Sequence, residues 1–523
     1  MICLCLTGST MDENAELLRH YRSYVDLVEL RVDLLDRSER ERFQRDPGRV
    51  LGAFPRVKRI LTCRRESDGG AWTDSEHERI AVLQALIAGG FDYVDIEDDL
   101  EDSVMYSLVS RGSRPIRSIH DLTGVPDDPA AVLERLSRNS AIAKLACSVR
   151  NTEDVARLVD AALERPMGTH VTLGMGDYGK VTRLLAGRIG SAWTYTSAAG
   201  AVSAAPGQVD PRALVEYFMY RGMERASAVF AVVGDPVEHS KSPEYHNSRF
   251  RRDKLNAVYI PFLTSDMTAF LRIARAVGIA GASVTVPHKH AAAEQADQVD
   301  DTVKQTGACN TLIREADMYL GTNTDIPGFL DPLESFLDRL GSATVIGAGG
   351  AARAVAYALL SRGTDVLIVN RTESRAHALA GALNESLRTL PSRREGVRPG
   401  SARSAGLPAD SSALQGYDSL IVQTTSCGMS PHTDADPVPG YQFGGHEIVY
   451  DIIYTPSVTR LLERAESSGC TVISGVRMFE AQAEIQYELF RRAYWSLKRR
   501  EASETPRYNG VNRQADRAPW DEE

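Results

Sequence analysis

The sequence has few of the residues that build disulfide or metal scaffolds. Its 523 residues include seven cysteines, and no two of them are spaced as C-x-x-C. This scarcity excludes a disulfide framework and gives no zinc motif, so we expect reduced thiols in a cytoplasmic protein. His288 and His290 flank a lysine rather than standing with carboxylates at ligand spacing, and we therefore predict no bound metal.

Long apolar runs and extended basic runs are also missing. No stretch is long enough to cross a membrane, and residues 1–8 lack the basic start and the cleavage site of a targeting peptide. The formal net charge of -10 argues against a surface that tracks nucleic acid, although local basic pockets can still bind small anions. We expect small-molecule substrates, no nucleic-acid or membrane partner, and a monomer or homodimer.

The length predicts more than one domain, because a single hydrophobic core stops growing well below 523 residues. Short β-rich runs alternate with longer amphipathic stretches in residues 1–220, which predicts parallel β-α units. Eight such units close into a (β/α)8 TIM barrel, so the expected fold class is α/β. The predicted strands are Ile2–Leu6, Val25–Val32, Arg59–Cys63, Tyr93–Glu97, Pro115–Ile119, Ala141–Ala146, His170–Leu173 and Ala192–Thr196.

The β-α alternation restarts near residue 226, which places the first domain boundary there. Residues 229–332 have the pattern of a small α/β unit, and strand Ala343–Ile346 then leads into a glycine cluster typical of a Rossmann fold. Residues 385–413 are rich in Ser, Arg, Gly and Pro, and we predict a mobile surface insertion there. The predicted divisions are 1–225 for the barrel, 226–332 for a substrate-binding domain, 333–474 for a nucleotide-binding Rossmann domain, 475–500 for a C-terminal helix that returns to the substrate domain, and 501–523 for a disordered tail.

Polar side chains interrupt the apolar pattern at the ends of successive barrel strands, where the active sites of this fold are built. Lys144 lies within the apolar run AIAKLA, and burial there lowers the pKa of an amine and leaves more of it neutral to attack a carbonyl. The resulting imine lets a nearby base remove an α-proton. His120 suits that role and the later protonation of a leaving hydroxyl. Arg183, after the seventh strand, can pair with a carboxylate.

Each of these residues also has an ordinary explanation. A lysine at a strand end is commonly solvated, a single histidine commonly satisfies local hydrogen bonds, and Glu29 with Arg31 can form a structural ion pair at the barrel rim. Polar groups at six successive strand ends are harder to explain in this way, because apolar side chains otherwise fill the barrel. The combination therefore favours a catalytic site.

These motifs resemble those of the type I 3-dehydroquinate dehydratases across residues 1–220. The matching segments are Glu29-x-Arg31-x-Asp33, the Ile-His120-Asp121 step, the strand of Lys144, Met175-Gly-x-x-Gly-x-x-x-Arg183 and Ala205-Pro-Gly-Gln208. The resemblance implies that Lys144 forms an imine with 3-dehydroquinate, that His120 is the general acid and base, and that Glu97 orients this histidine. The implied substrate-binding residues are Glu29, Arg31, Arg64, Arg183, Ser203 and Gln208. The family commonly has serine where this chain has Ala204, beside Ser203.

A nucleotide-binding pattern begins at residue 343. Strand Ala343–Ile346 is followed by Gly347-Ala348-Gly349-Gly350-Ala351 and a helix over 353–360, an arrangement that brings backbone N–H groups to a pyrophosphate. The next strand ends in Asn370-Arg371-Thr372, where proteins that bind NAD usually have an acidic residue. An arginine there attracts a 2′-phosphate, so the sequence favours NADP over NAD. A βαβ unit without a ligand is the alternative.

Further polar residues gather at strand ends between 234 and 325. Ser240 and Ser242 offer two hydroxyls on one turn for a carboxylate. Lys289 and Asp325 can stabilise and protonate the alkoxide that forms when a hydride reaches a ketone. A surface salt bridge is the ordinary explanation of the same lysine and aspartate.

The whole set resembles the shikimate dehydrogenases across residues 229–497. This resemblance implies that Lys289 and Asp325 act at the reacting oxygen and that 3-dehydroshikimate is reduced to shikimate with NADPH. The implied substrate-binding residues are Ser240, Ser242, Thr285, Asn310, Tyr454 and Gln482. The implied cofactor-binding residues are Gly347, Ala348, Gly349, Gly350, Ala351, Asn370, Arg371, Thr372, Thr425, Ser426, Gly428, Met429 and Gly475. Ser283 stands where this family frequently has asparagine.

Together the two resemblances predict a bifunctional enzyme of the shikimate pathway, which leads to the aromatic amino acids. Two alternatives stay open. Fungal repressors of the quinate pathway resemble the same domains without catalysis, but Lys144, His120, Lys289 and Asp325 are all present here and no added DNA-binding segment is visible. The other alternative is a second half that prefers quinate and NAD, against which Asn370-Arg371-Thr372 argues.

Overall fold

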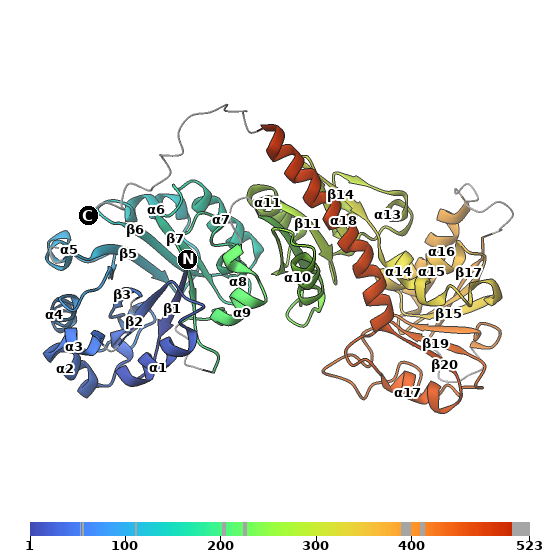
Figure 1. Cartoon of the computed structure of the whole chain (residues 1–523). Helices are drawn as coiled ribbons and strands as arrows, with labels where there is room; N and C mark the ends of the chain where they lie inside the picture. Colours follow the sequence, from blue (N-terminus) through green and yellow to red (C-terminus); the bar gives the residue numbers. More distant parts are fainter. Residues whose placement is uncertain are drawn as a thin grey trace.

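The computed structural model describes residues 1–52, 54, 57–109, 112–200, 205–222, 227–388, 399–407 and 414–504. In these residues one eight-stranded sheet and two six-stranded sheets follow one another along the chain. Figure 1 shows the blue and cyan barrel on one side, the green sheet next to it, and the yellow and orange sheet beyond. The order of the sheets in space is thus their order in the sequence.

The first eight strands form a parallel sheet in the order β7-β6-β5-β4-β3-β2-β1-β8. They are β1 (Ile2–Leu6), β2 (Leu27–Arg31), β3 (Lys58–Thr62), β4 (Tyr93–Glu97), β5 (Arg114–Asp121), β6 (Ile142–Ser148), β7 (His170–Met175) and β8 (Thr194–Thr196). The sheet nearly closes, because a parallel bridge joins His170 to Ser191 just before β8. The predicted (β/α)8 barrel is confirmed, and every predicted strand overlaps an observed one.

Helices cover the outside of this sheet with their apolar faces. In α7 (Thr152–Leu163), for example, Val155, Leu158 and Val159 are buried at a helical spacing. The other barrel helices are α1 (Met11–Tyr21), α2 (Arg37–Arg45), α3 (Pro47–Gly52), α4 (Glu76–Ile87), α5 (Asp102–Val109), α6 (Pro129–Leu136), α8 (Lys180–Leu184) and α9 (Pro211–Glu216). Short 3-10 turns lie at Val32–Leu34, Glu66–Asp68 and Tyr220–Gly222.

The second sheet is mixed and has the order β10-β9-β11-β13-β14-β12. Its strands are β9 (Ala228–Gly234), β10 (Ala257–Leu263), β11 (Ile279–Val284), β12 (Gln298–Val299), β13 (Thr311–Glu315) and β14 (Met318–Thr322). The accompanying helices are α10 (Ser242–Arg252), α11 (Met267–Val277), α12 (Lys289–Gln295), α13 (Asp301–Thr306) and α14 (Asp325–Leu330), with 3-10 turns at Asp331–Leu333 and Leu337–Arg339.

The third sheet is parallel throughout and has the order β17-β16-β15-β18-β19-β20. Its strands are β15 (Ser342–Ile346), β16 (Asp365–Asn370), β17 (Ala402–Gly406), β18 (Leu420–Gln423), β19 (Ile448–Asp451) and β20 (Thr471–Ser474). Its helices include α15 (Gly350–Leu360), α16 (Glu373–Arg388) and α17 (Arg460–Ser467). The first of these strands lies in the middle and the order reverses beside it, which is the Rossmann topology and confirms that prediction.

The predicted mobile insertion at 385–413 is wrong for the part that the structure describes. Helix α16 continues to Arg388, and β17 pairs with β16 at the edge of the sheet. Asn384 exchanges two hydrogen bonds with the main chain of Ala402, each 2.9 Å long. The polar composition concealed this strand because main-chain pairing holds an edge strand, which needs few apolar side chains. Residues 389–398 and 408–413 lie outside the described residues.

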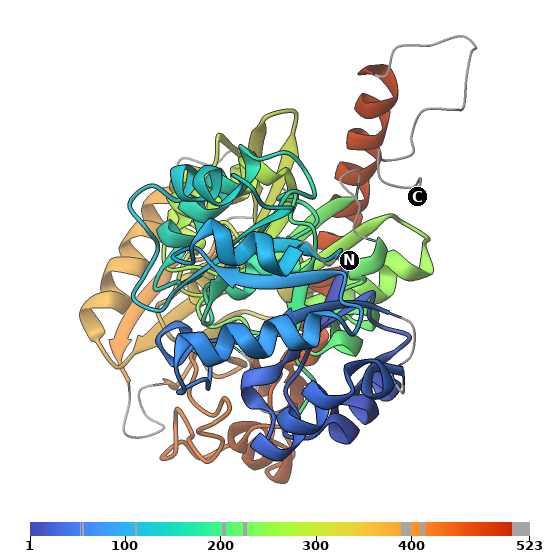
Figure 2. The ribbon, with the colours of Figure 1, turned by 90° about the vertical axis from the view of Figure 1, so that its left-hand side faces the viewer.

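One long helix connects the third sheet to the second. Helix α18 (Gly475–Glu504) begins directly after β20 and runs back across the second sheet, and its far end projects from the molecule in both views (Figures 1 and 2). Tyr487 and Phe490 of this helix pack with Phe230 and Phe250. The helix expected over 475–500 is thus present and runs on to Glu504. The rest of the expected tail, 505–523, lies outside the described residues.

The barrel and the second sheet share one hydrophobic cluster, which contains Val155 and Leu158 from one side and Phe270 and Ile273 from the other. Helix α7 lies against α11 at this junction. Arg188 reaches across and donates hydrogen bonds to the carbonyls of Val277, at 2.6 Å, and of Gly278, at 3.4 Å. The first two units are therefore packed together rather than merely tethered.

Candidate active sites

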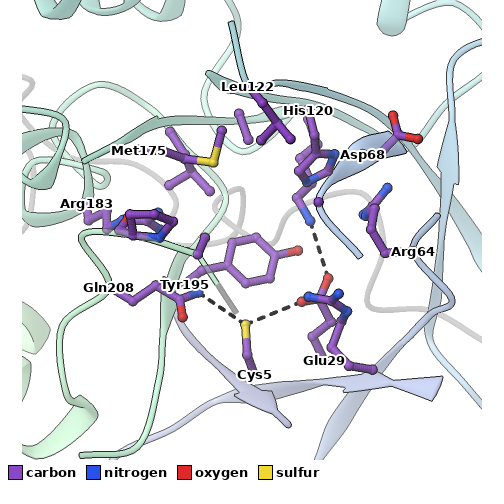
Figure 3. A pocket seen from close by; sticks show the side chains of 17 residues that line it. Cys5, Glu29, Arg64, Asp68, His120, Leu122, Met175, Arg183, Tyr195 and Gln208 are labelled. Atoms are coloured by element: carbon purple, nitrogen blue, oxygen red, sulfur yellow. Dashed lines mark hydrogen bonds and ion pairs between the residues drawn. The ribbon is translucent and has the colours of Figure 1, made fainter. Parts of the chain in front are cut away.

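The barrel has a cavity of about 150 Å³ at the carboxyl ends of its strands. Figure 3 shows side chains from several strands and loops converging on it, including those of Glu29, His120, Tyr195 and Arg183. Seven residues expected from the sequence line this cavity, namely Glu29, Arg31, Arg64, His120, Lys144, Arg183 and Gln208. Ser203, also expected there, lies outside the described residues.

The amine of Lys144 is buried among carboxylates. Its Nζ lies 2.7 Å from Asp95 Oδ2 and 3.3 Å from Glu29 Oε1, and it stands 4.3 Å from the centre of the Tyr195 ring. Burial lowers the pKa of this amine, but the charges of Asp95 and Glu29 outweigh burial, and the pKa of Lys144 is raised above its ordinary value. In the substrate-free protein the amine is therefore an ammonium group.

The prediction that apolar neighbours lower the pKa of Lys144 is wrong for this state. Ala143 and Leu145 precede and follow it in sequence, yet side chains alternate along a strand, and these two pack in the cluster outside the barrel. Lys144 faces inward, where closure of the barrel brings the carboxylates of β2 and β4 beside it. Its nearest charges are thus set by the fold and not by its sequence neighbours.

His120 ends in the same cavity as a neutral imidazole. Burial and the positive charges of Arg64 and Lys144 hold the pKa of His120 well below its ordinary value. Its Nδ1 has no hydrogen-bond partner among the described atoms. A neutral imidazole with an unoccupied nitrogen can accept a proton from a bound molecule.

Glu97 does not reach His120. Its Oε1 lies 2.7 Å from Arg64 Nη1 and its Oε2 lies 2.8 Å from Arg79 Nη1, so two arginines occupy both oxygens. In the described part of the chain we find no contact between Glu97 and His120. Arg64 also pairs with Asp95 at 2.9 Å. Among the described residues, Glu97 thus holds Arg64 and Arg79 and makes no direct contact with His120.

Arg183 is a buried guanidinium without a counter-ion. It follows β7 through a tight loop in which a Cβ on Gly179 would lie 2.3 Å from the carbonyl carbon of Gly174, so that only glycine fits. Its Nε and Nη1 have no partner among the described atoms, and burial lowers the pKa of Arg183 to about 10. The cavity thus holds an unpaired positive charge, ready for a carboxylate.

Three residues of this cavity or its wall were not predicted as site residues. Asp95 accepts hydrogen bonds from Lys144 and, at 2.5 Å, from Ser118. Its spacing from Glu97 places two carboxylates on the inner face of one strand, and this signal was available in the sequence. Cys5 lies 3.3 Å from Glu29 Oε2 and 3.4 Å from Gln208 Nε2. Nothing in the sequence distinguishes Cys5 or Tyr195 from ordinary core residues.

A second cluster of expected residues lies in the second sheet. Lys289 Nζ is 2.5 Å from Asp325 Oδ2, and Asn310 Nδ2 is 2.7 Å from Asp325 Oδ1. Gln482 of α18 comes close to the same place, because its Oε1 lies 3.5 Å from Thr324 Oγ1. Lysine, amide and carboxylate are therefore held as one group, which fits proton delivery to an oxygen.

The expected carboxylate-binding residues lie around the start of α10 and α12. The Ser240 hydroxyl accepts a hydrogen bond from the backbone N–H of Ser242 at 3.2 Å. Thr285 follows β11, four residues before Lys289. Tyr454 packs on Phe479 with ring centres 5.1 Å apart, and the Lys241 amine is 5.8 Å from its ring.

The glycine cluster after β15 lies beside Lys289. Gly347 has a φ of 119°, and a Cβ there would lie 2.5 Å from Thr424 Oγ1, so glycine is required. Ala348 and Gly349 follow it, and α15 then begins with Gly350 and Ala351, whose backbone N–H groups have no helical partner. A Cβ on Gly350 would lie 3.6 Å from Lys289 Cδ, so the nucleotide loop and this lysine adjoin.

The other expected cofactor residues lie at the same edge of the third sheet. Asn370 ends β16 and donates to the carbonyl of Thr372 at 2.9 Å, while Arg371 is exposed and forms no ion pair within the described ranges. An unpaired arginine at this point fits a 2′-phosphate. Thr425, Ser426, Gly428 and Met429 follow β18, and Gly475 follows β20.

Within the described ranges, no group of three or more His, Cys, Asp or Glu side chains is arranged to hold a metal ion. The helices of that part of the chain include none with the length and apolar character needed to span a membrane.

Family models match the chain in three successive segments. The model of type I 3-dehydroquinase matches residues 2–225, and the model of the shikimate dehydrogenase substrate binding domain matches residues 232–312. The model of shikimate / quinate 5-dehydrogenase matches residues 335–395.

Individual relatives match either nearly the whole chain or about half of it. A bifunctional 3-dehydroquinate dehydratase/shikimate dehydrogenase, chloroplastic, from Arabidopsis thaliana is 31% identical, over 95% of this chain and 84% of its own. A shikimate dehydrogenase (NADP(+)) from Methanopyrus kandleri is 40% identical over 50% of this chain and 89% of its own. A solved shikimate dehydrogenase in complex with NADP+ is 31% identical and covers 53% of this chain and 97% of its own, with a TM-score of 0.45. Because the Arabidopsis relative aligns with nearly the whole chain and family models match both halves, the chain belongs to the bifunctional 3-dehydroquinate dehydratase/shikimate dehydrogenase family.

Proposed function

We propose that the chain catalyses two consecutive steps of the shikimate pathway. The barrel dehydrates 3-dehydroquinate to 3-dehydroshikimate through an imine on Lys144, and the second half reduces this product to shikimate with NADPH. The observation that carries the proposal is the meeting of buried Lys144, neutral His120 and unpaired Arg183 in one cavity. The reduction is supported by the Lys289–Asp325 pair beside the glycine loop.

Dehydration begins when the substrate carboxylate pairs with Arg183. This pairing removes the free-energy cost of keeping the Arg183 guanidinium buried without a counter-ion. The ammonium of Lys144 must lose a proton before it can attack the ketone, and neutral His120 is the base of the cavity that can accept it. The amine attacks the ketone carbon, and His120 returns its proton to the resulting hydroxyl, which leaves as water and gives a protonated imine and a neutral histidine. Asp95 and Glu29, which stabilise the ammonium, then stabilise this cation as well.

His120 next removes a proton from the carbon beside the imine, and the electrons form a carbon–carbon double bond as the hydroxyl on the following carbon leaves. The histidine returns the proton to that hydroxyl, which departs as water. A further water hydrolyses the imine, releases 3-dehydroshikimate and restores Lys144. Over the full cycle one molecule of water is lost from the substrate.

Reduction needs a proton donor at the ketone oxygen and a carrier of hydride. When bound, NADPH supplies the hydride to the ketone carbon. Lys289 stabilises the negative charge that develops on the oxygen and gives it a proton, while Asp325 holds the amine at 2.5 Å. The residues proposed to bind the substrate are Ser240, Ser242, Thr285, Asn310, Tyr454 and Gln482.

The preference for NADP rests on Arg371. It is exposed at the end of β16 and has no ion pair within the described residues, so its charge is free for a 2′-phosphate. We therefore expect NADPH to support much faster reduction than NADH at equal concentration. Equal rates with both cofactors would contradict this part of the proposal.

The proposal extends to domain limits, compartment and assembly. We place the boundaries after residues 225, 332 and 474, which the three successive sheets support. The seven cysteines are free and all but Cys427 are buried, which fits a reducing cytoplasm. We propose a monomer or homodimer that acts on small molecules without a metal.

Two single variants test the function directly. Lys144→Ala should abolish dehydration of 3-dehydroquinate and leave the reduction of added 3-dehydroshikimate unchanged, whereas Lys289→Ala should do the reverse. Because both sites lie on one chain, each retained activity shows that the chain is expressed and that the half without the substitution has folded. Dehydration by Lys144→Ala at the rate of the unmodified chain would rule out the proposed first reaction.

A further inference from the structure

A line of buried polar side chains crosses the second sheet and ends at Asp325. Its members come from separate elements: Tyr259 from β10, Ser283 from β11, Gln486 from α18, Thr311 from β13, and Asn310 just before β13. All five side chains are buried, with exposed fractions between 0% and 6%. Buried polar groups of this kind are costly unless every member is paired.

The members are paired without a gap. Tyr259 Oη lies 2.6 Å from Ser283 Oγ, which lies 2.7 Å from Gln486 Oε1. Gln486 Nε2 lies 2.8 Å from Thr311 Oγ1, which lies 2.8 Å from Asn310 Oδ1. Asn310 Nδ2 then lies 2.7 Å from Asp325 Oδ1, and Lys289 occupies the other oxygen of that carboxylate.

Two main-chain groups determine the direction of every hydrogen bond in this line. The backbone N–H of Thr324 lies 2.8 Å from Asn310 Oδ1 and can only donate, so the amide N–H2 of Asn310 must face Asp325. The carbonyl of Asn310 lies 3.3 Å from Gln486 Nε2 and can only accept, so the amide of Gln486 is fixed as well. It follows that each hydroxyl donates to the next group along the line. Tyr259 donates to Ser283, Ser283 to Gln486 Oε1, and Thr311 to Asn310 Oδ1.

We propose that Gln486 is a positioning residue for the reduction step. Its amide directs the Thr311 hydroxyl onto Asn310 Oδ1. There the hydroxyl and the backbone N–H of Thr324 together hold the Asn310 amide, which donates to Asp325 and keeps that carboxylate aimed at Lys289. This inference rests on the proposed roles of Lys289 and Asp325 and deepens them. It also assigns a role to Ser283, whose hydroxyl donates to the side-chain oxygen Oε1 of Gln486 at 2.7 Å.

The position of Gln486 on α18 gives the arrangement a further consequence. Gln482 lies one turn earlier on the same face of the helix, and its Oε1 is 3.5 Å from Thr324 Oγ1. The helix begins at the third sheet, at Gly475, and thus ties the nucleotide-binding part of the chain to Asn310 and Asp325.

The direct test is Gln486→Met, which keeps the length of the side chain and removes its amide. We expect kcat for reduction of 3-dehydroshikimate to fall by up to about 100-fold, as for other small misplacements of reacting groups. KM should change much less, because Gln486 does not touch the substrate. Dehydration by the same polypeptide should be unchanged, which shows that the barrel is intact, and a KM for 3-dehydroshikimate near that of the unmodified chain shows that the second half has folded.

Gln486→Glu adds a readout that loss of packing cannot produce. A protonated glutamic acid can accept from Ser283 and donate to Thr311, whereas the carboxylate can only accept and turns the Thr311 hydroxyl away from Asn310. The ratio of its kcat to that of the unmodified chain should therefore fall as pH rises, while the ratio for Gln486→Met stays flat. Among the described residues, the other titratable groups around this position are His246 on α10, whose pKa burial lowers to about 3, Tyr259, and the Lys289–Asp325 pair.

Tyr487→Phe is the matched control, because Tyr487 is the next residue of α18 and its hydroxyl faces Asp253 instead of the line of side chains. It should leave kcat for reduction unchanged. If Gln486→Met fails to fold, Ser283→Ala serves in its place, with an expected smaller loss of kcat and unchanged dehydration.

The outcomes separate the two proposals. Reduction by Gln486→Met, or by Ser283→Ala where the first variant fails to fold, at a kcat within twofold of the unmodified chain would overturn the role of Gln486 alone. A pH-independent ratio for Gln486→Glu would do the same. Full reduction by Lys289→Ala would instead remove the proposed function on which this role depends.

Discussion

At the scale of single residues, Lys144 and Arg183 present opposite electrostatic situations in one cavity. Lys144 is over-supplied with negative charge, from Asp95 and Glu29, and Arg183 has none. A substrate that brings a carboxylate to Arg183 and a ketone to Lys144 satisfies both. The free site is therefore preorganised for an anion whose carboxylate pairs with Arg183 while a separate carbonyl group reaches Lys144.

Arg183 predicts a conflict between binding and stability. Burial lowers its pKa from 12.5 to about 10, which corresponds to a cost of about 3 kcal/mol to the folded, substrate-free protein at any pH below that value. Arg183→Met should relieve part of this cost and raise the temperature at which the barrel unfolds. The same variant should weaken binding of 3-dehydroquinate by a factor of roughly 100, since a charge-paired hydrogen bond is lost.

Calorimetry without substrate measures the unfolding temperature of Arg183→Met, and titration with 3-dehydroquinate measures its affinity for the substrate. A variant that unfolds at a lower temperature than the unmodified chain would show that Arg183 is paired in solution. A variant that binds the substrate normally would show that another residue receives the carboxylate.

The site residues differ in how far the sequence could reveal them. Glu29, His120 and Arg183 stand at strand ends, and the barrel alone predicts that such positions converge. The charge of Lys144 was not predictable in this way, because it depends on Asp95, which lies 49 positions earlier in the sequence and reaches the amine only when the barrel closes. The line through Gln486 joins five elements and likewise exists only in three dimensions.

At the scale of elements, β19 ends in a buried carboxyl group that shapes the loop carrying Tyr454. Asp451 Oδ1 accepts from the backbone N–H of Ile453 at 2.9 Å, and its Oδ2 accepts from Thr459 Oγ1 at 2.7 Å. Burial outweighs these hydrogen bonds and raises the pKa of Asp451 from 3.8 to about 6. The third sheet therefore carries a titrating group close to its proposed substrate edge.

The sign of the effect on stability follows from the raised pKa. Between about pH 4 and pH 6 the folded state binds more protons than the unfolded state, so stability is full below this window and declines as pH rises through it. The total decline is about 3 kcal/mol for a shift of this size. Asp451→Asn should not show it, because its amide does not titrate.

Urea unfolding of the unmodified chain and of Asp451→Asn, at several pH values across this window, measures the difference in their free energies of unfolding. The free energy of unfolding of Asp451→Asn, relative to the unmodified chain, should rise by about 3 kcal/mol from pH 4 to pH 7. A difference that stays constant with pH would mean that Asp451 titrates near its ordinary value when folded.

The strands differ in how well the sequence predicted them. Strands with apolar faces, such as β1 and β4, were predicted with their observed bounds, since burial on both sides demands such residues. β17 was not, because Ala402–Gly406 is held by main-chain pairing with β16 and by Asn384. Pairing of that kind leaves no hydrophobic period in the sequence.

At the scale of the whole molecule, the two enzymes are joined by a packed interface. Thr152 Oγ1 at the start of α7 lies 2.9 Å from Thr264 Oγ1, and Glu153 pairs with Arg272 of α11 at 2.9 Å. Arg188 adds hydrogen bonds to the carbonyls that end α11, and such carbonyls have no partner within their own helix. The barrel thus supports one face of the substrate-binding part of the second enzyme.

Arg188→Ala should loosen this interface locally. It leaves the carbonyls of Val277 and Gly278 without this donor, and we expect backbone hydrogen exchange to accelerate in α11 and α7. Exchange in α16, which lies on the third sheet, should not change and provides the control. Unaltered exchange in α11 would show that the hydrophobic cluster alone holds the two parts together.

The central claim is that Lys144 joins covalently to 3-dehydroquinate although it is an ammonium group in the free enzyme. Borohydride added during turnover of 3-dehydroquinate reduces an imine to a stable adduct, which peptide mapping can locate. We predict one adduct per chain, on Lys144, and none on the Lys144→Ala variant. An active, folded sample in which Lys144 stays unmodified, or in which another lysine carries the adduct, would contradict the account.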